Sequence, residues 1–211
     1  MSSILIIGAS GHGKVVAETA EAIGDWVTIA FLDDDFSNLN GKLRWSVVAG
    51  SKEAFAHGGT YDAVVIAIGH AATRLRFLNE LESAGCTLPA LVHPTAWVSP
   101  SARLAAGSVV FAGAVIQADA QIGRGVIVNT LASVDHDCEL GNGVHICPGA
   151  HLAGNVTVGE GSWLGIGCAI KQGVHLGRGV TVGAGAVVLS DVADGLTVAG
   201  CPARDISGTL G

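Results

Sequence analysis

A histidine between two carboxylates is the feature of this sequence that most directly suggests chemistry. His136 lies between Asp135 and Asp137, and Cys138 follows. A carboxylate bonded to one ring nitrogen fixes the tautomer of a histidine and raises its basicity, which suits the other nitrogen to accept a proton. We therefore predict that His136 is a general base. The alternative is a solvated surface histidine without a role.

Polar residues also follow three apolar runs in the first part of the sequence. They are the glycine-rich turn at residues 8–13, the pair Asp33-Asp34, and the group Gly69, His70 and Arg74. Backbone N–H groups of such a turn can hold phosphate, and ligands of open α/β sheets sit at the carboxyl ends of strands. The glycine spacing is G-x-x-G-x-G rather than the dinucleotide pattern G-x-G-x-x-G. Nucleotide-sugar binding and a plain strand-to-helix turn therefore both stay open here.

The elements that position His136 belong to a repeat with a period of six. An aliphatic residue recurs at every sixth position without an insertion, and the position four later is mostly small or β-branched. An α-helix has a period of 3.6 and a strand a period of 2, so neither explains this pattern. The aliphatic positions are Leu104, Val110, Ile116, Ile122, Val128, Val134, Leu140, Ile146, Leu152, Val158, Leu164, Ile170, Leu176, Val182 and Val188.

Short strands with a corner every six residues do explain this period. Three such sides close a triangular coil of about eighteen residues, with the aliphatic residues inside and glycine at the corners. Residues 92–191 would form about five coils, stacked about 4.8 Å apart. The repeat therefore predicts a β-solenoid, although the period alone does not set its hand.

Residues 1–88 alternate between predicted strands and helices. Strands are expected at residues 4–7, 27–32 and 63–68, and helices at 14–23, 51–57 and 71–84. This order favours a small Rossmann-like α/β domain with a parallel sheet. A segment rich in turn residues, 89–100, leads into the repeat. We predict two domains, 1–88 and 89–211.

The composition limits the classes of function. Hydrophobic residues make up 49% of the 211 residues and charged residues 14%, as expected of a globular protein with a sizeable core. The net charge of −7 argues against nucleic acid or an anionic membrane as a partner. No apolar run reaches the ~18–20 residues needed for membrane insertion. With no recognisable signal peptide, a cytoplasmic protein is expected.

The five cysteines do not form a recognisable framework. Their number is odd, their spacing is wide and no CxxC pair occurs, which favours reduced thiols. Cys138 and Cys168 fall on the small inward position of the repeat, so we interpret them as core residues rather than nucleophiles. A zinc site is an alternative for the histidines, because γ-class carbonic anhydrases share this solenoid. His145 and His151 differ from His136 in corner phase, however, and no metal is expected.

The spacing of two histidines predicts an assembly. His136 and His145 are nine residues apart, about half a coil, which puts them on different faces of one prism. They could serve one reaction only across a subunit boundary. Between Leu104 and Val188 the only Lys or Arg residues are Arg124, Lys171 and Arg178, so the sides of the solenoid carry few charges. We expect a homotrimer.

Several motifs together resemble a known family. They are residues 8–16, 31–34, 67–69, 128–130, 135–138, 144–146 and 197–203. Nearly the whole chain is similar to the NeuD-like family of sugar acetyltransferases of bacterial glycan synthesis. Within it, the chain resembles the N-acetyltransferases of nucleotide-linked 4-amino-4,6-dideoxy sugars of the bacillosamine pathway type. The resemblance implies a left-handed β-helix and acetyl-CoA as the acetyl donor.

The resemblance also implies roles for individual residues. His136 matches the general base, and Asp137 matches the acidic residue that raises its basicity, which is glutamate in many relatives. Asn129 would orient the sugar. Acetyl-CoA contacts are implied at His145, Ile166 and Ala184, and nucleotide-sugar contacts at Ser10, Gly11, His12, Asp33, Asp34 and Gly69. Many relatives have Gly-Asn-Asn where this chain has Gly69-His70-Ala71, which bears on the choice between UDP, which is expected, and GDP.

Three rival functions remain at this stage. The first is O-acetylation of a sialic-acid-type sugar on the same scaffold. The second is a non-catalytic binding solenoid, which would not need an acidic–histidine pair or a nucleotide-site cluster. The third is a nicotinamide oxidoreductase that uses the N-terminal domain.

Overall fold

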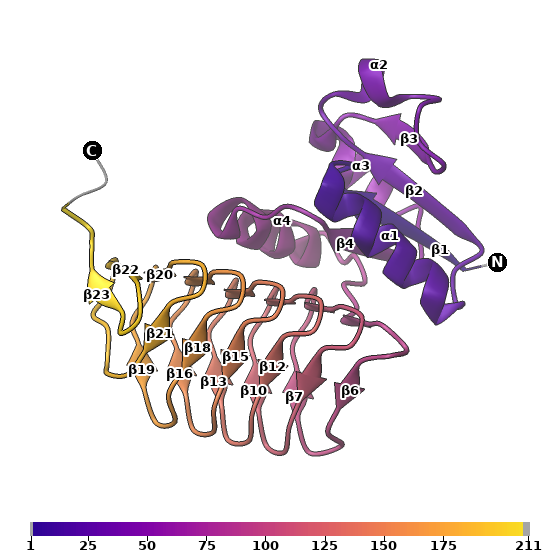
Figure 1. Ribbon diagram of the computed structural model, residues 1–211. Coiled ribbons are helices and arrows are strands. Elements are labelled where there is room, and N and C mark those ends of the chain that lie inside the picture. Colours follow the sequence, from indigo (N-terminus) through magenta and orange to yellow (C-terminus); the bar gives the residue numbers. More distant parts are fainter. Residues whose placement is uncertain (1, 209–211) are drawn as a thin grey trace. The chain divides into compact units, whose positions relative to one another are not determined.

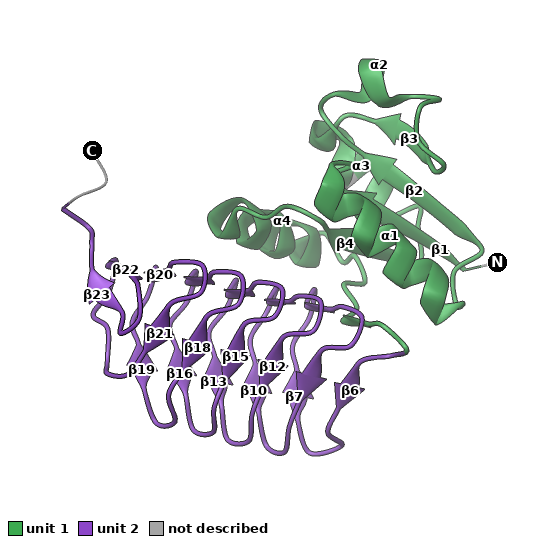
Figure 2. Cartoon of the chain, viewed as in Figure 1, with its two compact units in different colours: residues 1–94 green, residues 95–211 purple. Residues whose placement is uncertain are grey.

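The computed structural model describes residues 2–208 and divides the chain into two compact units. Unit 1 comprises residues 1–94 and unit 2 residues 95–211 (Figure 2). The sequence placed the domain boundary at 88/89, at the start of the turn-rich segment 89–100, whereas the structure divides the chain within that segment, between residues 94 and 95. Among the described residues, no helix is both long and apolar enough to cross a membrane.

Unit 1 is built on a parallel four-stranded sheet in the order β3-β2-β1-β4 (Figure 1). Its strands are β1 (Ser3–Ile7), β2 (Thr28–Leu32), β3 (Ser46–Ala49) and β4 (Ala63–Ile66). Residues 4–7 of β1 are fully buried, because β1 is a central strand that pairs with β2 on one side and β4 on the other. The carboxyl ends of β1, β2 and β4 therefore meet at one edge, where parallel sheets bind ligands.

Helices connect these strands. They are α1 (Gly11–Ile23), α2 (Phe36–Leu39), α3 (Ala54–Gly58) preceded by the 3₁₀ turn η1 (Ser51–Glu53), and α4 (Ala71–Ser83). The predicted helix at 14–23 in fact begins at Gly11, so the glycine turn supplies its first turn. Gly13 is required there, because a methyl group on its Cα would lie 2.0 Å from the carbonyl oxygen of Gly8. Strand β5 (Leu91–Val92) ends unit 1.

Unit 2 is a β-helix, as the period of six predicted, and it is left-handed, as the family resemblance implied; all its described strands have two residues except β22, which has three. The strands are β6 (Trp97–Val98), β7 (Arg103–Leu104), β8 (Val109–Val110), β9 (Val115–Ile116), β10 (Gln121–Ile122), β11 (Ile127–Val128), β12 (Ser133–Val134), β13 (Glu139–Leu140), β14 (His145–Ile146), β15 (His151–Leu152), β16 (Thr157–Val158), β17 (Trp163–Leu164), β18 (Ala169–Ile170), β19 (His175–Leu176), β20 (Thr181–Val182), β21 (Val187–Val188), β22 (Thr197–Ala199) and β23 (Arg204–Asp205).

Three parallel sheets form the three faces of the prism (Figure 1). The first face contains β8, β11, β14, β17, β20 and β22, the second face β6, β9, β12, β15, β18 and β21, and the third face β7, β10, β13, β16 and β19. Most strands pair with the strand eighteen residues later, as Ile127 pairs with His145 and Gln121 with Glu139, whereas β20 pairs with β22 sixteen residues later. Strand β23 is different, because it pairs antiparallel with β22.

The second residue of most strands points into the prism and forms its core. Ile146, Leu164 and Val182, for example, are fully buried in successive coils. The small inward position holds residues such as Cys138 and Cys168, both fully buried, which agrees with their interpretation as core residues. Two buried serines also occupy it, and Ser162 donates a hydrogen bond to the carbonyl oxygen of Gly177 at 2.8 Å. A buried hydroxyl therefore has its partner inside the prism.

The glycines of the repeat serve two different purposes. Those directly after the inward aliphatic residue lie against the next coil: a methyl group at Gly159 would lie 2.5 Å from the backbone of Gly177 and Arg178. The left-handed corners use a different set, exemplified by Gly143 at φ 67°. The sequence pattern assigned corner geometry to the first set, whereas their actual requirement is the close approach of stacked backbone.

Candidate active site

His136 and Asp137 form a hydrogen-bonded pair at the corner between β12 and β13. The ring Nδ1 lies 2.7 Å from Asp137 Oδ2, and the backbone N–H of His136 donates to Asp135 Oδ1 at 2.8 Å. The bond to Asp137, together with the negative charges of Asp135 and Asp137, raises the pKa of His136. Because the carboxylate accepts from Nδ1–H, the lone pair of Nε2 is left to accept a proton.

Asp137 owes its orientation to an unusual backbone conformation. Its φ is 57°, in the left-handed region that few residues other than glycine, asparagine and aspartate adopt. Its backbone N–H donates to the carbonyl oxygen of Ala118 in the preceding coil at 3.0 Å. The corner is thereby fixed by coil stacking, and the short carboxylate is presented to the neighbouring ring.

The ring of His136 borders a hollow of about 430 Å³ that is open to solvent. Both side chains of the pair are more than half exposed, so an approaching substrate can reach them. The residues that line the hollow come from three successive coils of the same corner. They are Asp135, His136, Ala153, Gly154, Asn155, Gln172 and Gly173.

His145 and Asn129 meet on the first face of the prism. His145 Nε2 lies 3.3 Å from Asn129 Nδ2, and the His145 ring stands edge-on to Trp163 of the next coil with ring centroids 6.4 Å apart. The side-chain oxygen Oδ1 of Asn129 accepts a hydrogen bond from the backbone N–H of Thr130 at 2.8 Å. Its amide is therefore held with the NH₂ group toward His145.

Ile166 and Ala184 follow the strands β17 and β20 of this same face. Both residues are exposed, Ile166 to 55%, and the Gly185 N–H donates to the Ile166 carbonyl oxygen at 2.8 Å, so the two corners are stacked. The exposed apolar side chain of Ile166, on the face that carries His145, suits the apolar part of an extended ligand. The structure thus groups His145, Asn129, Ile166 and Ala184 along one side of the prism.

The structure does not bring His136 and His145 together within one chain. His136 lies at the corner between the second and third faces, whereas His145 is in β14 of the first face. The separation on different faces agrees with the half-coil spacing in the sequence.

The edge of the sheet in unit 1 holds a second hollow, of about 230 Å³. It is lined by Ser10, Asp33, Asp34 and Gly69 among others, so four predicted site residues meet there. Asp33 Oδ2 accepts a hydrogen bond from the backbone N–H of Ala9 at 2.7 Å and so ties the glycine turn to β2. Ser51 also lines this hollow, and the sequence analysis missed it.

Ser51 fixes the carboxylate of Asp34. Its hydroxyl and its backbone N–H donate to Asp34 Oδ1 at 2.7 and 3.0 Å. The hydroxyl bond and then the backbone bond lower the pKa of Asp34. Ser51 follows β3, a strand that the sequence analysis did not predict.

Gly11 and His12 follow Ser10 in the sequence, but unlike Ser10 they do not line this hollow. Gly11 is the exposed first residue of α1, and His12 is half-buried. Burial, and then the positive charge of Arg74, lower the pKa of His12 to about 4. Arg74 is 1% exposed and donates to the carbonyl oxygens of Ile68 and Gly69 at 2.6 and 2.7 Å, which anchors the turn after β4.

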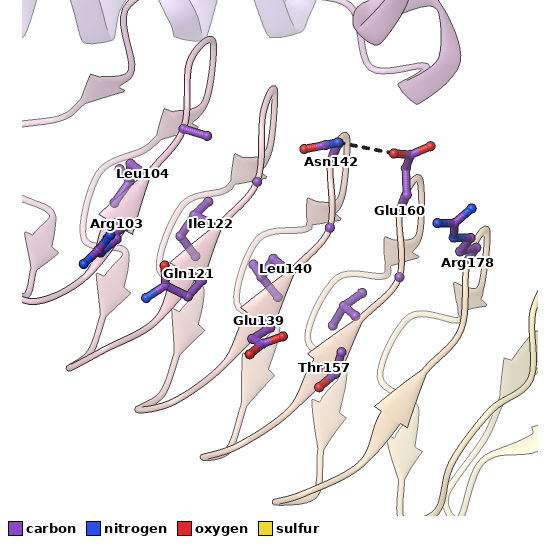
Figure 3. A pocket seen from close by; sticks show the side chains of 15 residues that line it. Arg103, Leu104, Gln121, Ile122, Glu139, Leu140, Asn142, Thr157, Glu160 and Arg178 are labelled. Atoms are coloured by element: carbon purple, nitrogen blue, oxygen red, sulfur yellow. Dashed lines mark hydrogen bonds between the residues drawn. The ribbon is translucent and has the colours of Figure 1, made fainter.

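A third hollow lies along the third face of the prism and contains none of the predicted site residues. It has a volume of about 740 Å³ and is lined by side chains of both charges, including Arg103, Glu139, Glu160 and Arg178 (Figure 3). Asn142 donates to Glu160 there at 3.3 Å. Within residues 2–208, no group of three or more His, Cys, Asp or Glu side chains could hold a metal ion.

The repeat and the fold place the chain in the class of hexapeptide-repeat transferases. Residues 3–81 match the family described as the PglD N-terminal domain, and residues 155–190 match the bacterial transferase hexapeptide repeats. The chain is 45% identical to the acetyltransferase domain of PglB from Neisseria gonorrhoeae FA1090, solved in complex with acetyl coenzyme A. The match has a TM-score of 0.93 and covers 97% of this chain and 98% of that one.

Two further similar proteins have names that state a bound ligand or an activity. PerB from Caulobacter crescentus, solved with CoA and GDP-perosamine, is 38% identical with a TM-score of 0.91 and 97% coverage of both chains. UDP-N-acetylbacillosamine N-acetyltransferase of Bacillus subtilis (strain 168) is 37% identical over 113 residues, 53% of this chain and about half of that protein's length. The chain therefore belongs to the family of hexapeptide-repeat sugar N-acetyltransferases with a PglD-type N-terminal domain, which agrees with the bacillosamine-pathway type that the motifs predicted.

Proposed function

We propose that this protein transfers the acetyl group of acetyl-CoA to the 4-amino group of a nucleotide-linked 4-amino-4,6-dideoxy sugar, with UDP as the carrier. The observation that carries the proposal is the His136–Asp137 pair, with Nδ1 and Oδ2 2.7 Å apart, beside an open hollow. The proposal is also supported by the 45% identity of the chain with an acetyltransferase domain that was solved with acetyl coenzyme A.

His136 removes the proton as the bond to the acetyl group forms. Nε2 accepts a proton from the sugar amine while the amine nitrogen attacks the thioester carbonyl. The new C–N bond forms, the C–S bond breaks, and the proton passes from Nε2 to the leaving CoA sulfur. A thioester is already activated, so the reaction needs no covalent enzyme intermediate. Backbone N–H groups of the solenoid stabilise the developing oxyanion.

The remaining predicted residues divide between the two substrates. His145, Ile166 and Ala184 lie along one side of the prism and would contact acetyl-CoA, with Asn129 beside His145 orienting the sugar. Ser10, Asp33, Asp34 and Gly69 line the hollow in unit 1 and would hold the nucleotide. Gly11 would offer its backbone at the start of α1, where helix N-terminal N–H groups bind phosphate. His12 would support the glycine turn without lining the hollow.

A release assay for the CoA thiol tests the substrate class. Acetyl-CoA is offered with UDP-linked and GDP-linked 4-amino-4,6-dideoxy sugars and with a sialic-acid-type sugar. We expect thiol release with the amino sugars, fastest with the UDP carrier. Because PerB was solved with GDP-perosamine, both carriers belong in the panel. Release only with the sialic-acid-type sugar, and an O-acetyl product, would overturn the proposal.

Replacing His136 with Ala tests the general base. Turnover should fall by about 10²–10⁴, the usual contribution of a general base, with little change in KM. Turnover near that of the unmodified protein, in a variant with an unchanged thermal midpoint, would contradict this assignment.

A further inference from the structure

Gly154 occupies the position one coil after His136. Positions eighteen residues apart stack at this corner, so Ala118, His136, Gly154 and Gln172 follow one another in register. The backbone N–H of Asn155 donates to the His136 carbonyl oxygen at 2.9 Å, and that of Gly173 donates to the Gly154 carbonyl oxygen at 3.0 Å. Side chains precede and follow Gly154 in this column, so the corner does not itself exclude one.

The His136 ring occupies the space that a side chain at residue 154 would fill. A methyl group on the Cα of Gly154 would lie 2.5 Å from both Cε1 and Nε2 of the ring, and 3.1 Å from Cδ2. Carbon atoms in van der Waals contact are about 3.5–4.0 Å apart, so ring and methyl group cannot both hold these places.

Gly154 differs from the glycines that serve coil stacking in what it approaches. At Gly141 and Gly159 the nearest atoms are backbone atoms of the next coil, so those glycines serve coil stacking. At Gly154 the three nearest atoms all belong to the His136 ring, and its φ is outside the left-handed region. An alanine there would meet no backbone strain and would displace only the ring.

We propose that Gly154 is a positioning residue: by lacking a side chain, it lets the His136 ring lie over its Cα, at the border of the hollow, with Nδ1 against Asp137. The catalytic part of this proposal rests on the proposed function, whereas the placement of the ring does not. A ring pushed away from Gly154 must rotate about its side-chain bonds. That rotation lengthens the 2.7 Å contact with Asp137, which holds the proton on Nδ1.

Gly154→Ala, compared with Gly59→Ala, tests the proposal. Gly59 has a φ of −73° and no atom within 4 Å of an added methyl group, so its variant controls for a glycine-to-alanine change in open space. The titration of His136 is followed by NMR with isotope-labelled histidine, and kcat and KM are measured in the thiol-release assay.

In Gly154→Ala we expect the pKa of His136 to fall toward the ordinary value of about 6.5, because the bond to Asp137 is lost. We also expect kcat to fall about tenfold or more while the KM for acetyl-CoA stays within about twofold, since the base alone is displaced. Gly59→Ala should match the unmodified protein in all three quantities.

Two results would overturn the proposal. One is an unchanged His136 pKa and kcat in Gly154→Ala. The other is a raised KM for the amino sugar with an unchanged His136 pKa, which would mean that the methyl group fills the hollow without moving the ring. Should Gly154→Ala not fold, the unmodified protein still decides: the Hε1 of His136 must show a nuclear Overhauser contact with the Hα protons of Gly154, and its absence refutes the placement.

The two proposals fail in different ways. A fully active His136→Ala variant would remove the proposed base but leave the NMR results for Gly154→Ala intact. A loss of the Overhauser contact, or an unmoved titration, would remove the role of Gly154 and leave the acetyl transfer untouched.

Discussion

At the scale of single residues, Asp137 has two roles: it forms the left-handed corner, and it binds the His136 ring. Its backbone has a φ of 57°, and its carboxylate accepts the Nδ1–H of His136. Aspartate and asparagine tolerate the left-handed region better than most side chains, because their short polar groups bond locally. The corner and the orientation of the His136 ring therefore depend on the same residue.

Replacing Asp137 with Asn should separate its role in the corner from its effect on the His136 ring. Asparagine keeps the corner but removes the charge that raises the pKa of His136. A base must be unprotonated, so the acidic limb of kcat/KM should move to lower pH in the variant than in the unmodified protein. The plateau rate should fall about tenfold or more, because the less basic ring accepts a proton less well. An acidic limb at the same pH in both proteins would contradict this cause.

Cys138 lies next to the His136–Asp137 pair but should take no part in the proposed reaction. It is fully buried, its Sγ–H donates to the Ala153 carbonyl oxygen at 3.2 Å, and burial raises the pKa of its thiol. Cys138→Ala should keep activity within a few-fold and lower the free energy of unfolding by about 1 kcal/mol. Thiol-release kinetics and thermal unfolding check this. A stable but inactive variant would revive covalent catalysis by the cysteine.

The distance in sequence between partners decided which site residues could be predicted. Asp137 adjoins His136, so the pair is visible in the sequence. Ser51 reaches Asp34 only through the edge strand β3, whose four residues follow a stretch with no clear strand pattern. Gly154 is eighteen residues from His136, and it comes to lie under the ring only when the coils stack, so the sequence alone does not reveal the pair.

At the scale of elements, the stacked coils depend on glycines that lie too close to a neighbour to bear a side chain. Gly159→Ala should cost about 1–3 kcal/mol of unfolding free energy, the usual cost of overpacking, because the added methyl group would meet backbone 2.5 Å away. Thermal or denaturant unfolding measures the change, with Gly59→Ala as the control expected to lie within about 0.5 kcal/mol of the unmodified protein. Equal midpoints for the two variants would show that the coils can separate without cost.

The solenoid was easier to predict from the sequence than the α/β unit. Its period of six repeats through every coil, so one irregular residue does not obscure the pattern. In unit 1 each element occurs once, and the short elements α2 and β3 have too few residues to show a period. The start of α1 was placed late, because glycines at 11 and 13 suggested a turn rather than the first turn of a helix.

At the scale of the whole molecule, we expect a homotrimer with three active sites between neighbouring prisms. His136 and His145 lie on different parts of the prism surface, so a ligand that needs both must touch two chains. A three-sided prism with few charged residues on its sides suits threefold closure. Sedimentation should give three times the mass of the 21.1 kDa chain.

A mixing experiment tests whether the sites are shared. Inactive His136→Ala chains are exchanged with chains inactivated only at His145, and some interfaces then combine both intact residues. Partial activity should return, provided that the change at His145 abolishes activity by itself. A monomer in sedimentation, or no activity after verified subunit exchange, would count against a shared site.

The reversed strand β23 has a consequence for solubility. In a solenoid of parallel coils, the edge strand of each face offers unpaired N–H and C=O groups that another chain could continue. On the first face that edge is held by β23, which runs antiparallel to β22 and consists of two exposed, oppositely charged residues, Arg204 and Asp205. A neighbouring prism would need a parallel, apolar edge strand to add a coil, and β23 is neither. This face is therefore protected against end-to-end growth into fibres.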